Sequence, residues 1–122
     1  MKVLIFENSK QITERLICLI SETILNVTFY KAGSYAEAIY FYNECNPDAV
    51  ILDIHYPDNN GVKLLERIKA ANDKTIVIAL SSHGDDYNLQ RWEQSGAHYM
   101  LDKFAEFEKI PMIIDGVRAN MN

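Results

Sequence analysis

The 122-residue chain has few cysteines, few basic residues and no long apolar run, and each shortage excludes a class of protein. Its two cysteines, Cys18 and Cys45, lack the spacing of a metal or redox motif, so reduced thiols are expected. Only 12 Lys and Arg stand against 17 Asp and Glu, and the net charge of −5 argues against a nucleic-acid partner. No stretch approaches the roughly 20 continuous apolar residues of a membrane span, so no membrane association is expected.

The sequence also lacks the marks of a second domain or of export. It has no repeat, no low-complexity segment and no linker rich in Pro, Gly or Ser. Residues 1–122 are therefore expected to form a single domain with no output domain. The first apolar run, at residues 3–6, is too short for a signal peptide, and no small-residue cleavage site follows it. These absences predict a cytoplasmic protein.

What the chain does have is a regular alternation of short β-branched runs and longer amphipathic segments. The pattern predicts strands at 2–6, 27–31, 49–52, 75–80 and 98–101, and helices at 10–25, 34–45, 61–71, 85–95 and 108–120. Strict alternation of strands and helices is typical of an α/β domain, in which a parallel sheet is covered on both faces.

Polar residues follow four of the predicted strands. Right-handed crossovers place the carboxyl ends of parallel strands at one edge of the sheet. The residues expected to meet there are Glu7 and Asn8, Asp53, Ser81 and Ser82, and Lys103. A tight turn should follow Asp53, because Pro57 fixes φ and the run Asn59-Asn60-Gly61 supplies turn geometry.

This set of side chains suits the transfer of a phosphoryl group to a carboxylate. Asp53 would be the nucleophile and would form an acyl phosphate. Oxygen ligands at Glu7 and Asn8 would hold Mg²⁺, which neutralises charge on the moving phosphoryl group. Ser81 and Lys103 would each hold a phosphoryl oxygen. Both lie at the open edge, so their truncation is expected to impair the response more than folding.

In this order, the motifs resemble the receiver domain of two-component response regulators over essentially the whole chain. The resemblance is greatest to the stand-alone, chemotaxis-type members. The matching residues are Glu7, Asp53 with Pro57 and Gly61, Ser81 with Ser82, Gly96-Ala97, and Lys103. The resemblance implies a flavodoxin-like doubly wound sheet of five parallel strands in the order 2-1-3-4-5, with five helices. Its site would lie at the switch point between the first and third strands.

The resemblance also implies a role in phosphorelay signalling. A sensor histidine kinase or phosphotransfer protein would phosphorylate Asp53, and the aspartyl phosphate would change binding to a downstream protein. The chain would be a monomer or weak homodimer. It would not be an enzyme, except that it would catalyse its own phosphorylation and dephosphorylation. The backbone carbonyl of His55 would join Glu7, Asn8 and Asp53 around Mg²⁺. The remaining implied residues are His55 and His83 at the pocket rim, and Trp92, Tyr99 and Met100 on a partner-binding face.

Three residues depart from the family pattern. Asn8 replaces an acid, so one negative charge is lost and Mg²⁺ should bind weakly. Phe104 replaces the proline that usually follows the lysine. Because a cis bond before a non-proline residue costs about 3 kcal/mol, a trans bond and a displaced Lys103 are expected. Met100 occupies the place of an aromatic switch residue, while the adjacent Tyr99 should point to the opposite face of its strand.

These departures leave an alternative open: a pseudo-receiver that acts as a phosphorylation-independent interaction or dimerisation module. The retention of Asp53, Ser81 and Lys103 together argues against it. An aspartyl-nucleophile phosphatase ranks last, because the segment Asp53-Ile54-His55 lacks the second acid of such enzymes.

Overall fold

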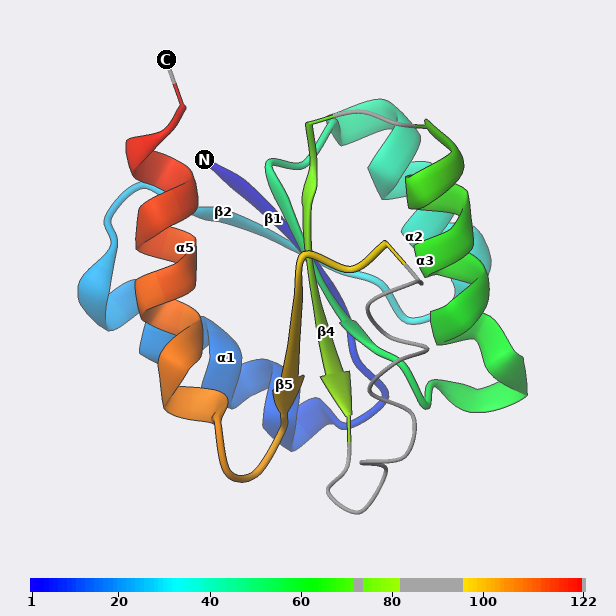
Figure 1. Ribbon diagram of the computed structural model, residues 1–122, viewed down its shortest axis with the longest axis horizontal. Coiled ribbons are helices and arrows are strands. Elements are labelled where there is room, and N and C mark those ends of the chain that lie inside the picture. The colour runs from blue at the N-terminus through cyan, green and yellow to red at the C-terminus, as the bar shows by residue number, and fades with distance from the viewer. Residues whose placement is uncertain (72–73, 82–95, 122) are drawn as a thin grey trace.

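The computed structural model describes residues 1–71, 74–81 and 96–121. Within these ranges strands and helices alternate along the chain from the first strand to the fourth (Figure 1). The elements are β1 (Lys2–Phe6), α1 (Lys10–Thr23), β2 (Thr28–Lys31), α2 (Tyr35–Cys45), β3 (Ala49–Asp53), the 3-10 turn η1 (Pro57–Asn59), α3 (Asn60–Ala71), β4 (Ile76–Ser81), β5 (Tyr99–Asp102), the 3-10 turn η3 (Phe107–Lys109) and α5 (Ile110–Ala119). The helix predicted at 85–95 lies outside the described residues.

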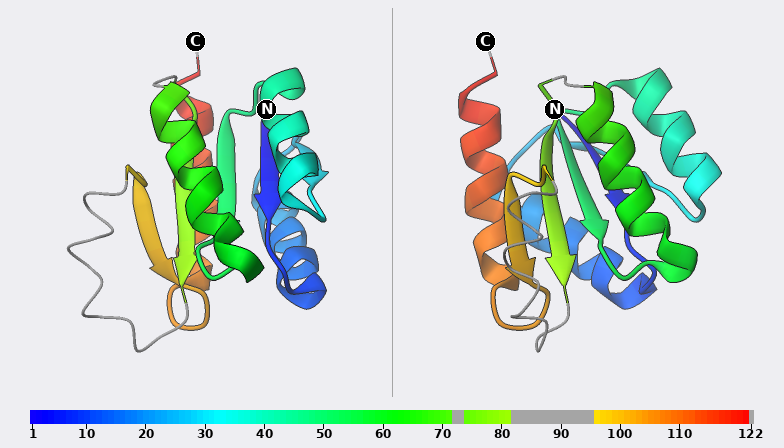
Figure 2. Two further views of the ribbon diagram at one scale, coloured as in Figure 1. Left: turned by 90° about the vertical axis from the view of Figure 1, so that its right-hand side faces the viewer. Right: turned by 45° about the vertical axis from the view of Figure 1, so that its right-hand side comes forward.

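The five strands form one parallel sheet in the order β2-β1-β3-β4-β5, as the sequence predicted. Helices α1 and α5 cover one face, and α2 and α3 cover the other (Figures 1 and 2). Each face has its own apolar cluster. Leu16, Ile20, Ile110 and Ile114 pack against one side of the sheet, and Ala38, Tyr42, Leu64 and Leu65 pack against the other.

Three strands extend one residue further than their apolar runs predicted, and each extension matters for the site. Asp53 is the last residue of β3 and pairs with Leu80 of β4. Ser81 is the last residue of β4 and pairs with Asp102 of β5. The polar residues at the sheet edge are therefore held by strand pairing rather than by free loops.

Serine side chains fix the beginnings of the first two helices. Ser9 Oγ accepts a hydrogen bond from Ile12 N–H at 3.2 Å, and Ser34 Oγ accepts one from Glu37 N–H at 3.1 Å. The Glu37 carboxylate in turn accepts a hydrogen bond from Gly33 N–H at 3.0 Å, one residue before the cap, so it ties the preceding loop to the first turn of α2. Among the helices of the described ranges, none combines the length and apolarity that a bilayer crossing requires.

Candidate functional site

The carboxyl edge of the sheet brings together three ionisable side chains: one directly after β1, one at the end of β3 and one directly after β5. Lys103 Nζ lies 3.0 Å from Glu7 Oε1 and 3.4 Å from Asp53 Oδ2. The three side chains are 10%, 0% and 6% exposed, so this ion-pair network is almost completely shielded from solvent. The strand arrows in Figure 1 end at this edge. The predicted meeting of Glu7, Asp53 and Lys103 is therefore observed.

Asp53 is held firmly in this network. It ends the central strand β3, in which every residue is buried. Its Oδ1 accepts a hydrogen bond from His55 N–H at 2.9 Å, and its backbone carbonyl accepts one from Tyr56 N–H at 3.1 Å. The chain then turns through Asp58 and Asn59, both with φ of 61°, in the left-handed region that Asp and Asn tolerate. The hydrogen bond from His55 N–H and the ion pair with Lys103 fix the orientation of the Asp53 carboxylate.

Glu7 follows β1 and is fully enclosed. Its Oε2 accepts a hydrogen bond from Ser9 N–H at 2.6 Å, and its Oε1 accepts one from Lys103. Burial nonetheless raises the pKa of the Glu7 carboxyl above its ordinary value of 4.5, and the charge of Asp53 adds to the rise. The hydrogen bonds from Ser9 and Lys103 oppose this change in pKa without cancelling it. The fold therefore keeps a carboxylate where its charge is disfavoured.

This raised pKa predicts how metal-free stability depends on pH. Because the folded state holds the Glu7 proton more tightly than the unfolded state, the Glu7 contribution to stability is full below the unfolded pKa. It is lost as pH rises through the folded pKa. We expect the free energy of unfolding of wild type, relative to Glu7→Gln, to fall as the pH rises above about 4.5, the ordinary pKa of a glutamate. Urea unfolding in a chelating buffer at each pH measures this difference.

The control for this experiment is Glu108→Gln, which removes a charge from an exposed glutamate outside the site. Its difference from wild type should change little over the same range. A wild-type minus Glu7→Gln difference that stayed constant with pH would show that Glu7 titrates alike in the folded and unfolded states.

The expected displacement of Lys103 is wrong. The described residues contain no cis peptide bond, so the Lys103–Phe104 bond is trans as predicted. The lysine nevertheless reaches both acids, and its backbone N–H donates to Ser81 O at 2.9 Å. The β4–β5 ladder thus continues into the loop and directs the lysine inward.

The donor set fits a weakly held Mg²⁺ ion. Among residues 1–71, 74–81 and 96–121, no group of three or more His, Cys, Asp and Glu side chains could hold a metal. The buried acids at the edge are the pair Glu7 and Asp53, with Asn8 exposed beside them. One or two carboxylates completed by neutral oxygens and water are enough for Mg²⁺, although each lost charge lowers affinity.

The other predicted site residues fall into three groups. Ser81 is half-buried at the end of β4, at the same edge of the sheet as Glu7 and Asp53. His55, two residues after Asp53, is exposed. On β5, Tyr99 is 43% exposed, whereas Met100 packs against the cluster of α2 and α3, so the two side chains point to opposite faces as expected. Ser82, His83 and Trp92 lie outside the described residues.

Tyr56 is a site residue to which the sequence analysis gave no role. Its ring stacks on Phe6 with centroids 3.8 Å apart, and its hydroxyl donates to Gly33 O at 3.1 Å. Burial and the nearby Asp53 raise the pKa of the Tyr56 hydroxyl. Tyr56 therefore links the loop after β3 to the loop before α2, close enough to Asp53 to feel its charge. The sequence did offer one indication of this role, because Tyr56 lies three residues after Asp53 and directly before Pro57, in the turn beside the nucleophile.

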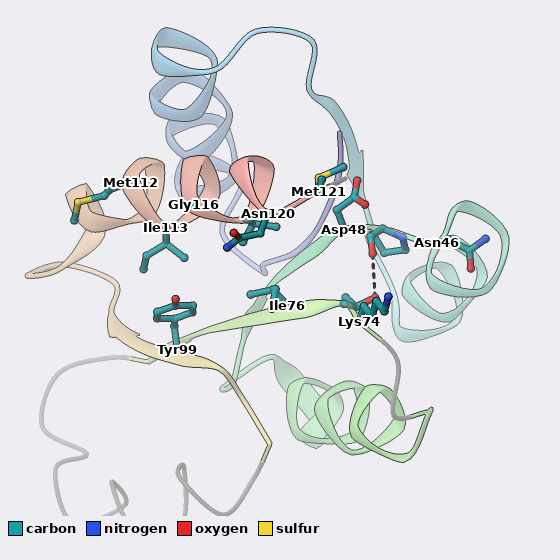
Figure 3. Close-up of a pocket in the computed structure, with 13 residues that line it drawn as sticks. Asn46, Asp48, Lys74, Ile76, Tyr99, Met112, Ile113, Gly116, Asn120 and Met121 are labelled. Atoms are coloured by element: carbon teal, nitrogen blue, oxygen red, sulfur yellow. Dashed lines mark hydrogen bonds between the residues drawn. The ribbon is translucent and has the colours of Figure 1, made fainter.

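A hollow of about 880 Å³ lies elsewhere, between α5 and the amino ends of β3, β4 and β5 (Figure 3). Tyr99, Ile113 and Met112 line one side of it, and Asp48 and Lys74 line the other. Parallel strands begin at this edge and end at the edge that carries Asp53. The hollow is therefore not part of the acidic site.

Comparison with known proteins agrees with this geometry. The family model described as the response regulator receiver domain matches residues 3–115. The sensory transduction protein LytT of Oceanobacillus iheyensis is 26% identical over 98% of this chain and 49% of its own length. Sporulation initiation phosphotransferase F of Bacillus subtilis is 28% identical over 73% of this chain and 69% of its own length. The chain thus spans about half the length of the LytT relative.

Solved structures show the same fold. A receiver domain of a DNA-binding response regulator from Colwellia psychrerythraea superposes with a TM-score of 0.88, covering 98% of this chain and 99% of that one, at 24% identity. The relatives are named for sensory transduction and sporulation, so the finer resemblance to chemotaxis-type members is not confirmed. The acidic edge, the strand order and the match over residues 3–115 agree: this chain belongs to the response regulator receiver domain family.

Proposed function

We propose that this chain is a phosphorylatable signalling switch in which Asp53 accepts a phosphoryl group from a sensor histidine kinase or phosphotransfer protein. The observation that carries the proposal is the Lys103 ammonium group, 3.0 Å from Glu7 and 3.4 Å from Asp53. A cation already held beside the nucleophile can pair with an arriving phosphoryl oxygen. Family membership supports the same reaction class.

The proposed reaction is a displacement at phosphorus. A carboxylate oxygen of Asp53 forms the new bond while the phosphorus–nitrogen bond of a phosphohistidine breaks, and the freed imidazole leaves with the electron pair and takes a proton. Ser81, at the end of β4, would donate a hydrogen bond to a second phosphoryl oxygen. Catalysis would extend no further than the chain's own phosphorylation and dephosphorylation.

Glu7, Asn8, Asp53 and the backbone carbonyl of His55 would hold Mg²⁺, which supplies positive charge against the phosphoryl group. Asn8 contributes no charge, so the affinity should be low. His55 is exposed next to the nucleophile and would influence the lifetime of the aspartyl phosphate from the pocket rim.

The output would be a change in protein binding, in the cytoplasm, by a monomer or weak homodimer. Tyr99, at 43% exposure, and Met112, at 71%, present apolar surface on β5 and α5. Exposed aromatic and methionine side chains are typical of partner-binding surfaces.

The test is chemical labelling followed by intact mass measurement. Wild type incubated with phosphoramidate and Mg²⁺ should gain the mass of one phosphoryl group, because phosphoramidate presents the same phosphorus–nitrogen bond as phosphohistidine. Asp53→Asn should gain none. The matched control is Asp58→Asn, which removes an exposed acid five residues away and should label like wild type. Equal labelling of wild type and Asp53→Asn would refute the proposal.

A pseudo-receiver remains the second candidate. The exposed Asn8 favours it, because the buried acids at this edge, among the described residues, are Glu7 and Asp53 alone. Such a module would bind its partner whether or not Asp53 is phosphorylated. It predicts no label in wild type and partner binding unaffected by Asp53→Asn. The labelling experiment therefore separates the two candidates.

A further inference from the structure

The loop after β5 is closed by the side chain of Asp102. Its Oδ1 accepts two backbone hydrogen bonds, from Phe104 N–H at 2.8 Å and from Ala105 N–H at 2.9 Å. Asp102 also pairs with Ser81 across the β4–β5 ladder, so this carboxylate is anchored on the strand side. The two bonds fix the direction in which the chain leaves Lys103.

Glu106 closes the same loop from the other end. Its Oε1 accepts a hydrogen bond from Asp102 N–H at 3.1 Å, and its own N–H donates to Asp102 O at 3.0 Å. Lys109 Nζ holds the second carboxylate oxygen at 2.7 Å. The side-chain bonds of Asp102 and Glu106 therefore form one reciprocal clamp, called here the Asp102–Glu106 clamp, around residues 103–105.

Lys103 is the residue that the clamp surrounds. Its side chain is 10% exposed and points toward the carboxylates of Glu7 and Asp53, whereas the next side chain, Phe104, is 65% exposed. The loop from 103 to 106 contains neither proline nor glycine, so no residue with special backbone geometry fixes its shape. The backbone direction at Lys103 then depends on the clamp's hydrogen bonds and on the bond from its own N–H to Ser81 O.

We propose that Asp102 and Glu106 are positioning residues that place the Lys103 ammonium group between Glu7 and Asp53. In this chain the hydrogen bonds of two carboxylates hold the loop backbone in place, a task that a rigid residue after the lysine, such as proline, could otherwise perform. The consequence for phosphorylation rests on the proposed function. The placement of Lys103 itself does not.

Two double-mutant cycles test the proposal, one on stability and one on chemistry. Asp102→Ala and Lys103→Met are made singly and together, with Asp102→Asn as the conservative variant that keeps the Oδ1 acceptor. The control is Asp115→Ala, which removes a half-exposed α5 acid that pairs with Arg118. Urea unfolding midpoints are measured without metal, and labelling rates are measured with phosphoramidate and Mg²⁺.

If the clamp acts through Lys103, Asp102→Ala should slow labelling about tenfold. The reason is that a small displacement of the Lys103 ammonium group weakens its contact with the phosphoryl group in the transition state. It should slow labelling no further in the Lys103→Met background. Lys103→Met should also shift the unfolding midpoint less in the Asp102→Ala background than in wild type. Asp102→Asn should recover most of the wild-type rate, and Asp115→Ala should match wild type.

Strictly additive effects in both cycles would overturn the proposal, because Asp102 would then act independently of the lysine. If Asp102→Ala does not fold, Glu106→Ala replaces it, with Glu106→Gln as its conservative variant and the same outcomes. If wild type takes no label, the proposed function fails, and the stability cycle alone decides whether the clamp positions Lys103.

Discussion

Replacing Gly61 with alanine is expected to destabilise the protein by about 3 kcal/mol and to abolish phosphorylation of Asp53. Gly61 lies in the first turn of α3, where alanine would ordinarily be the better helix former. Here an added Cβ would overlap the backbone carbonyl oxygen of Asp53 and would come within 3.0 Å of the Ile54 backbone. Because β3 is paired on both sides by β1 and β4, the strand cannot move away without breaking ladder bonds.

The matched control for this variant is Gly116→Ala in α5. Gly116 is also in a helix, but in the described part of the chain no heavy atom beyond its own stretch of helix lies within 4 Å of the position its Cβ would take. Alanine should therefore stabilise the protein there by roughly 0.5–1 kcal/mol. Urea unfolding and phosphoramidate labelling of both variants measure the effects. A Gly61→Ala protein as stable as Gly116→Ala and labelled at the wild-type rate would contradict this prediction. It would show that α3 can shift to accommodate the Cβ without displacing Asp53.

The fold was predictable because local patterns and topology agree. The strands at residues 3–6, 49–52 and 76–80 are almost wholly apolar, as buried parallel strands must be, and helical periodicity separates them. Right-handed crossovers then leave one arrangement of the strand ends. Glu7, Asp53 and Lys103 were placed at one edge by that rule alone, and the structure confirms their contact.

The position of Lys103 could not be predicted in detail, because it depends on bonds between side chains and loop backbone. The presence of Phe104 at the place of the usual proline is visible in the sequence. The hydrogen bonds that hold the loop in the absence of that proline are not. Asp102 and Glu106 read as ordinary surface acids until the loop folds so that their oxygens meet backbone N–H groups. The degree of burial was missed for the same reason: an open sheet edge was expected, and the lysine is enclosed by the acids that it pairs with.

That burial reverses the expectation that truncating Lys103 would leave stability unchanged. Lys103→Met is expected to lower the free energy of unfolding of the metal-free protein by about 3–5 kcal/mol, the usual cost of removing one partner from a buried ion pair. Methionine preserves most of the side-chain volume, so the loss reports on charge rather than on a cavity. Without the ammonium group, the Glu7 and Asp53 carboxylates lie unneutralised in a site where burial already raises the pKa of Glu7.

Two second changes should relieve this loss if its cause is electrostatic. Adding Glu7→Gln to Lys103→Met removes one of the two facing charges and should restore a large part of the stability. Adding Mg²⁺ should also stabilise Lys103→Met, and by more than it stabilises wild type, because any cation that binds only the folded state stabilises it by mass action. Both results are obtained from urea unfolding at neutral pH, with and without the metal.

Lys63→Met provides the comparison, since Lys63 is exposed on α3 and its loss should change stability by no more than about 0.5 kcal/mol. A Lys103→Met protein that unfolds at the same urea concentration as Lys63→Met would mean that the two acids do not depend on the lysine. The same conclusion would follow if Glu7→Gln gave the Lys103→Met protein no more stability than it gives wild type. Either outcome would reduce Lys103 to a group that acts only after phosphorylation. The expected outcome instead makes Lys103 a structural cation that holds the two buried acids together in the unphosphorylated site.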